Sequence, residues 1–208
     1  VRNTVRIPDL TSRSFVLETP VQEGSVLVNA IDTTELFTQL TTLELQCESG
    51  ALVFPLPENV CLGAIVPRHG QGTAPSVVPL VGYPLERGAI ASTISHDSHN
   101  LVVIGKDPRD MLAASLELAR CGGGLTSVLN NSVLATVKLP IAGLMSPNPV
   151  PEIAQAVVQF EQSLGNLGLR KAFPLHLLAL ALPVVPEVRL TDKGLVDAEA
   201  QELLPLFP

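Results

Sequence analysis

Short apolar segments separated by turn residues constrain this fold most, because they predict strands over much of the chain. Residues 26–31 and 41–47 are two such segments, and the second alternates apolar and polar positions as a half-buried strand does. Residues 51–56 are expected to return as its partner after a turn. The stretch VCLGAIVPRHG (60–70) is a further strand that runs into a Gly-rich loop at residues 70–73.

The clearest helix is predicted from Asp107 to the glycines at 122–124. Asp107 suits the N-cap and Pro108 suits the first helical position, while glycine takes the left-handed conformation that ends many helices. Its expected apolar stripe consists of Leu112, Leu116 and Ala119.

The second half of the chain contains a hairpin, another helix and apolar strands. Asn130 and Asn131 predict a two-residue turn between two strands, because asparagine tolerates positive φ. Residues 140–149 are expected to form a loop. A helix is predicted over residues 151–168, with Gly165 or Gly168 as its end and Ile153, Val157, Phe160 and Leu164 on one stripe. Residues 175–190 predict one or two apolar strands, followed by a turn at TDKG.

These patterns predict an α+β fold, in which a mainly antiparallel β-sheet built from hairpins carries two principal helices. We expect one domain over residues 1–208, with a division into a strand-rich subdomain (1–75) and an α+β subdomain (76–208) left open. The sequence has no repeat and no regular strand–helix alternation. A (β/α)₈ barrel needs about 250 residues and eight helices, so this chain cannot form one.

The composition restricts the partners. Hydrophobic residues make up 46% of the chain and charged residues 16%, which is typical of a folded protein with a core. A net charge of −7 without a Lys/Arg run argues against nucleic acid. The longest apolar stretch, residues 177–185, is too short to span a membrane and contains Pro183.

The compartment is expected to be the cytoplasm. Arg2, Arg6 and Asp9 interrupt any apolar run that could serve as a signal peptide. The three cysteines are an odd number and lie far apart, which fits reduced thiols in the core.

The stretch HDSHN, residues 96–100, is the main candidate site because His96, Asp97, His99 and Asn100 lie between two apolar segments. Imidazole and carboxylate groups could bind a divalent metal or handle protons together. Asp, Ser and Asn are also favoured turn residues, so a structural turn explains this stretch equally well.

Two other places contain histidine. In PRHG, residues 67–70, Arg68 and His69 stand where a strand meets a loop, a common position for binding groups, although a solvated turn explains them as well. His176 lies on an apolar run and is better explained as a hydrogen-bonded core residue. The glycines match neither the Rossmann fingerprint nor the P-loop.

Five blocks in order resemble the C-terminal domain of adenine deaminase, a member of the amidohydrolase superfamily. They are RGAIASTISHDSHNLVVIG, DM, GGG, LPIAGLMS and LALPVVPEVRLTDKGLVD, between residues 87 and 197. The combination of HDSHN, LPIAGLMS and DKGLVD is much more specific than any one block. VRNTV and VPRHG are weaker agreements that extend the resemblance to nearly the whole chain.

The resemblance implies a role in purine salvage. Adenine deaminases convert adenine and water to hypoxanthine and ammonia, using manganese or iron held in a (β/α)₈ barrel upstream of this kind of domain. We therefore expect no metal ligands in this chain, and expect the barrel domain and adenine to be its partners in the intact enzyme. His96, Asp97, His99 and Asn100 would close the purine site or relay protons, and Arg68 and His69 would bind substrate. The chain alone is expected to be inactive.

Two alternatives stay open. The first is a non-catalytic assembly domain that packs on the barrel or forms a homo-oligomer. The second is a small metal-binding module that uses His96, Asp97 and His99, but no third histidine or cysteine lies nearby in sequence to complete a closed site.

Overall fold

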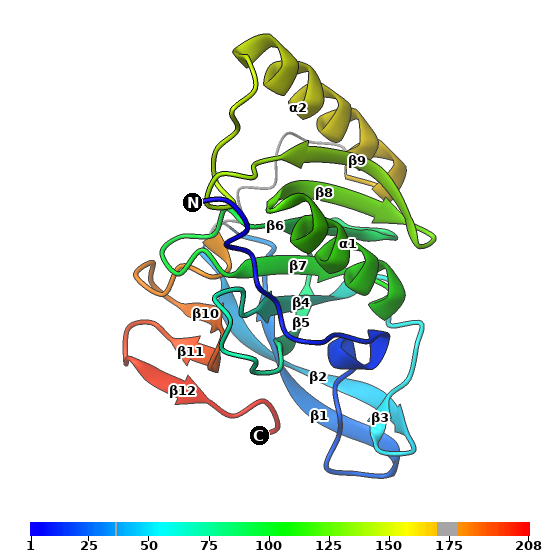
Figure 1. The fold of residues 1–208 in the computed structure, drawn as a ribbon. Helices are drawn as coiled ribbons and strands as arrows, with labels where there is room; N and C mark the ends of the chain where they lie inside the picture. Colours follow the sequence, from blue (N-terminus) through cyan, green and yellow to red (C-terminus); the bar gives the residue numbers. More distant parts are fainter. Residues whose placement is uncertain (36, 170–178) are drawn as a thin grey trace.

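The structure is a computed structural model that describes residues 1–35, 37–169 and 179–208. In these ranges the chain forms one nine-stranded sheet, one three-stranded sheet and two α-helices (Figure 1). The large sheet has the order β3-β2-β1-β5-β4-β7-β6-β8-β9. Its neighbouring strands are antiparallel, except that β1 and β5 are parallel, so the predicted α+β class with a mainly antiparallel sheet is confirmed.

The large sheet contains β1 (Glu23–Asp32), β2 (Gln39–Glu48), β3 (Ala51–Leu52), β4 (Val60–Val66), β5 (Ser76–Val81), β6 (Ala89–Ser92), β7 (Leu101–Gly105), β8 (Gly124–Leu129) and β9 (Ser132–Lys138). The small sheet contains β10 (Val188–Thr191), β11 (Gly194–Asp197) and β12 (Glu202–Leu204). The helices are α1 (Pro108–Cys121) and α2 (Val150–Leu164), with short 3₁₀ turns at Ser12–Phe15 and Gly165–Leu167.

Both faces of the central strands β4, β6 and β7 of the large sheet are covered. In β7, Val102 and Ile104 belong to one apolar cluster, while Leu101 and Val103 belong to the other, because successive side chains of a strand point to opposite faces. Helix α1 packs on one face over β6, β7 and β8 (Figure 1). Helix α2 packs against β8 and β9 from the other face, and the small sheet contributes to the same cluster.

Helix α1 begins and ends as predicted, but its buried stripe differs. The Asp107 carboxylate accepts the N–H of Arg109 at 2.8 Å, and Gly122 takes the left-handed conformation after the last turn. The prediction of Leu112, Leu116 and Ala119 as the stripe was wrong. Leu116 is 48% exposed, and the buried apolar residues of the helix are Pro108, Met111, Ala114 and Leu118. Met111, Ala114 and Leu118 form a second stripe with helical spacing, which the choice of Leu112 and Leu116 missed.

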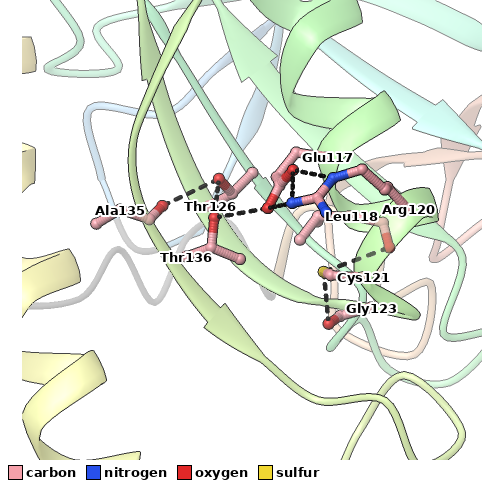
Figure 2. A network of polar contacts seen from close by, with 8 residues as sticks. All are labelled: Glu117, Leu118, Arg120, Cys121, Gly123, Thr126, Ala135 and Thr136. Atoms are coloured by element: carbon pink, nitrogen blue, oxygen red, sulfur yellow. Dashed lines mark hydrogen bonds and ion pairs between the residues drawn. The ribbon is translucent and has the colours of Figure 1, made fainter.

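Polar contacts fix α1 on the neighbouring hairpin (Figure 2). Glu117 accepts both Arg120, at 2.8–2.9 Å, and the hydroxyl of Thr136, at 3.3 Å. Thr136 in turn lies 3.0 Å from the hydroxyl of Thr126, which also donates to the carbonyl of Ala135 at 3.0 Å. Polar contacts between side chains therefore connect the last turns of α1 to β8 and β9.

The hairpin turn and the second helix are confirmed. Asn130 and Asn131 have φ values of 52° and 61° between β8 and β9, and Gly168 has φ 88° after the 3₁₀ turn that follows α2. Phe160 and Leu164 of the predicted stripe are buried, and Ile153 and Val157 pack against the same cluster.

Two predicted strands were wrong in extent. The strand at residues 51–56 is only Ala51–Leu52, because Pro55 and Pro57 cannot donate to a ladder. Of the segment 175–190, residues 170–178, which include His176, lie outside the described residues, and residues 180–187 form turns and bends. Leu180 and Ala181 are nevertheless buried, and the strand begins only at Val188.

The parallel contact between β1 and β5 is short. It consists of Ile31 opposite Leu80 and Asp32 opposite Val81, and through it β1, β2 and β3 join the rest of the large sheet. Further along β1, the backbone N–H of Asn29 donates to the carbonyl of Leu206 at 2.8 Å, and its side chain donates to the carbonyl of Pro205 at 2.9 Å. No helix in the described ranges is long and apolar enough to cross a membrane.

Candidate functional site at one end of the sheet

The predicted site residues gather at one end of the large sheet. The end of β4 and the start of β7 are neighbours there, since Val66 is opposite Leu101. The residues after β4 therefore lie beside the loop between β6 and β7, which we call the 96–100 loop. The side chain of Arg68 donates from Nε to the carbonyl of His99, and Nε2 of His69 lies 2.8 Å from the carbonyl of Ser98.

The histidines of the 96–100 loop lie close together. The ring centroids of His96 and His99 are 5.1 Å apart, with planes inclined at 56°. Nδ1 of His96 is 3.7 Å from the carboxylate of Asp97, and these two side chains are 60% and 74% exposed. The loop contains a cis peptide bond between His96 and Asp97, and His99 has φ 49° while its N–H donates to the carbonyl of Ser95 at 2.6 Å. The loop thus presents two imidazoles and a carboxylate at the surface.

Arg68 and Asn100, in contrast, are buried, with 2% and 3% of their surface exposed. The amide oxygen of Asn100 accepts the backbone N–H of Arg68 at 3.3 Å. Nη1 and Nη2 of Arg68 both donate to the carbonyl of Ala142 at 3.1 Å. Among the described residues, no carboxylate forms an ion pair with this guanidinium.

The surroundings favour a neutral His99. Burial lowers its pKa, electrostatic interactions with His96, Arg68 and His69 lower it further, and Asp97 opposes them. Within the described part of the chain, Nδ1 of His99 is buried and has no hydrogen-bond partner. Burial likewise lowers the pKa of Arg68, whose guanidinium nevertheless stays charged at neutral pH. A neutral imidazole next to exposed polar groups can accept or donate a proton.

The described residues do not fit a manganese or iron centre. Nowhere in the described ranges do three or more His, Cys, Asp or Glu side chains come together as a metal site would require. In the 96–100 loop, His96, Asp97 and His99 are near one another in sequence, but their side chains do not converge on one point. A metal centre therefore has no candidate ligand set here.

The sequence did not point to the 140–146 loop as part of this site. Its Ala142 carbonyl accepts hydrogen bonds from the guanidinium of Arg68. Its Gly143 carbonyl accepts a hydrogen bond from the hydroxyl of the buried Thr93 at 2.6 Å. These residues have the composition of an ordinary loop, so no local sequence pattern identifies them as part of a site. The LPIAGLMS block of the family resemblance was the one signal that could have indicated them.

A mostly antiparallel α+β domain, with a histidine-containing loop at one end of its sheet, is the class of protein that these observations define. The family model described as the adenine deaminase C-terminal domain matches residues 35–202. The chain belongs to this family.

Curated relatives extend the similarity over nearly the whole chain. The chain is 37% identical over 208 residues to adenine deaminase 2 of Carboxydothermus hydrogenoformans, covering 99% of this chain and 36% of the relative. It is 37% identical over 201 residues to the adenine deaminase of Moorella thermoacetica, covering 95% of this chain and 34% of the relative. With the adenine deaminase of Brucella melitensis it shares 34% over 205 residues, covering 98% and 35%. The chain thus spans about a third of the length of these relatives.

Proposed function

We propose that this chain is the C-terminal domain of an adenine deaminase and supports the hydrolytic deamination of adenine to hypoxanthine and ammonia. The observation that carries the proposal is the family match over residues 35–202, within which both histidines of the 96–100 loop lie beside Arg68 and His69. The relatives that the chain matches over nearly its full length are named adenine deaminases. A cytoplasmic location is part of the proposal, and the free thiols of Cys47, Cys61 and Cys121 agree with it.

The metal chemistry is assigned to another domain. Manganese or iron, held in the (β/α)₈ barrel that the family resemblance implies, would supply the hydroxide that attacks C6 of adenine. Because the described residues offer no ligand set, we place the metal outside this chain and propose that the 208 residues alone do not deaminate adenine.

The residues of the site divide into two groups by their exposure. His96, Asp97 and His99 would face the purine site of the barrel, where they close it and move protons. The partly exposed His99, whose neutral form the fold favours, is the best candidate for accepting a proton, since its Nδ1 is unpartnered within the described residues. Asn100 and Arg68 are buried in hydrogen bonds to the backbone, which supports a role in holding the loop.

The test uses an intact adenine deaminase that carries this domain. His96, Asp97 and His99 are each replaced by Ala, and Asp192, in the β10–β11 turn, is replaced by Ala as the control. A proton-transfer role predicts that His99→Ala lowers kcat by about 10²-fold or more, with the thermal midpoint within a few degrees of the wild type. If all three loop variants stay folded and keep wild-type kcat and KM for adenine, the proposed role of the loop is wrong.

The isolated chain provides a second test. Purified 208-residue protein is incubated with adenine and with manganese or iron, and ammonia release is measured. We expect none above the buffer control, because the hydroxide-generating centre belongs to the barrel. Turnover at one metal ion per chain would refute this part of the proposal.

An assembly role is the second candidate function. Leu27 and Leu40 are 55% and 44% exposed and point to the same face of the β1–β2 pair, as their register shows. Such side chains suit contact with the barrel or with a second copy of the chain. Light scattering of the isolated domain, compared with Leu27→Ser and Leu40→Ser, tests whether it self-associates through this face.

A further inference from the structure

Arg68 is an unusual residue for the centre of this site, because it is a buried cation whose hydrogen bonds go to carbonyls. Burying a guanidinium is unfavourable unless its charge and its donors are satisfied. Nε donates to the carbonyl of His99, and Nη1 and Nη2 donate to the carbonyl of Ala142 at 3.1 Å. The guanidinium therefore connects two loops that are more than 40 residues apart in the chain.

The main chain of Arg68 adds a third segment. Its N–H donates to the side chain of Asn100 at 3.3 Å, and its carbonyl accepts the N–H of Arg6 at 2.9 Å. The N–H of Ala142 donates to the carbonyl of Val1 at 2.8 Å, so the N-terminal segment contacts both Arg68 and the 140–146 loop. In Figure 1 the N-terminus lies at this end of the sheet.

The 140–146 loop fits the guanidinium closely. Gly143 has φ 72°, and a Cβ at this position would lie 2.5 Å from Nη1 and 3.1 Å from Cζ of Arg68. On its other side, a Cβ on Gly123 would lie 2.5 Å from Cα of Gly143. Any side chain at Gly143 must therefore displace the guanidinium or the loop itself.

We propose that Arg68 is a positioning residue, whose guanidinium locks the 96–100 loop and the 140–146 loop into one unit and so fixes where His96 and His99 are presented. Its relevance to deamination rests on the proposed function, but the coupling between the loops does not. Gly143 lies against Nη1 of Arg68, whereas Nε of the same guanidinium donates to the carbonyl of His99. A change there reaches the 96–100 loop through the arginine, and the Arg68→Lys background separates this route from the contact between Thr93 and the Gly143 carbonyl.

The test is a double-mutant cycle on the 208-residue chain, with amide hydrogen exchange as the measurement. Gly143→Ala is compared with Gly72→Ala, which has nearly the same backbone angle, φ 71°, but no atom within 4 Å of the added Cβ. The reporter is the amide of His99, which donates to Ser95, and amides of the β4–β7 pair serve as the internal reference.

We expect Gly143→Ala, and not Gly72→Ala, to speed exchange at His99 by about tenfold or more, which is the effect of losing one charge-assisted hydrogen bond. Arg68→Lys keeps the charge but loses the planar fork, so it should speed exchange at His99 and Ala142 together. In the Arg68→Lys background, Gly143→Ala should add little. Should Gly143→Ala not fold, Arg68→Lys against the exposed control Arg109→Lys carries the test.

Equal exchange at His99 in Gly143→Ala and Gly72→Ala would overturn the proposal, as would effects of Gly143→Ala and Arg68→Lys that simply add. The intact enzyme then separates this inference from the proposed function. If the two loops loosen together while kcat for adenine is unchanged, Arg68 positions the loop but the loop does not act in deamination.

Discussion

The carboxylate of Asp110 is predicted to hold the hairpin turn between β8 and β9 onto the start of α1. Asp110 lies in the first turn of α1 and is 5% exposed. Its Oδ1 accepts the N–H of Asn131 at 2.5 Å and its Oδ2 accepts the N–H of Asn130 at 3.3 Å. Both asparagines have positive φ in a tight turn, and this carboxylate accepts the backbone N–H groups of both.

Replacing Asp110 with Ala removes one short charge-assisted bond, one long bond and a favourable charge at the helix N-terminus. A hydrogen bond to a charged group contributes about 1.5–3 kcal/mol, and the helix-terminal charge about 0.3–1 kcal/mol. Because the turn is partly exposed, water can solvate the freed amides, so we expect a net loss of about 2–3 kcal/mol. For a chain of this length that corresponds to a fall in Tm of about 4–12 °C.

The measurement is urea and thermal unfolding followed by circular dichroism. Asp110→Asn keeps an acceptor for Asn131 but turns an NH₂ group toward Asn130, so it should lose about half as much stability as the alanine variant. Asp9→Ala, at an exposed position, is the control and should change the free energy of unfolding by less than about 0.5 kcal/mol. If Asp110→Ala and Asp9→Ala unfold at the same midpoint, the carboxylate does not hold the turn.

Three further predictions follow from burial and charge. Because the fold lowers the pKa of His99, the unfolded chain binds more protons than the folded chain below pH about 6.5. The free energy of unfolding should therefore decrease as the pH is lowered in that range, and it should decrease less steeply in His99→Gln. Met111→Ala should lower the free energy of unfolding by about 2–5 kcal/mol, and the exposed Leu116→Ala by less than about 1 kcal/mol, in urea titrations. Iodoacetamide should label the half-buried Cys121 of the native protein before Cys61, which is 1% exposed and whose pKa burial raises to about 12; equal labelling rates would contradict this.

Features fixed by neighbouring residues were predictable from the sequence. Asp107 and Gly122 act within one turn of the helix ends, and Asn130 and Asn131 form a turn by their own backbone preferences. The buried side of α1 was not predictable in this way. Its orientation depends on the sheet beneath it, where a Cβ on Gly105 would lie 2.3 Å from Met111, and no local pattern reports that contact.

The candidate site likewise has a part that was predictable from the sequence and a part that was not. HDSHN and PRHG stand out in the sequence because polar residues interrupt apolar segments, and the structure brings them together. Their meeting depends on β4 and β7 being neighbours, and strand order in a sheet is a long-range property. The contact between Arg68 and Ala142 joins residues 74 positions apart, which neither spacing nor periodicity could indicate.

The short contact between β1 and β5 has a consequence for how the sheet opens. Within the described residues the ladder of this seam has two residue pairs and one further backbone bond, from Thr33 to Val81 at 2.9 Å, whereas β1 and β2 pair over ten positions. Beyond the seam, the C-terminal residues supply the partners of Asn29 and protect an edge of β1 that would otherwise be open to other chains. The last few residues thus shield this edge of β1 from other chains. A truncation that removes them should cause this acidic protein to aggregate before it disturbs the 96–100 loop.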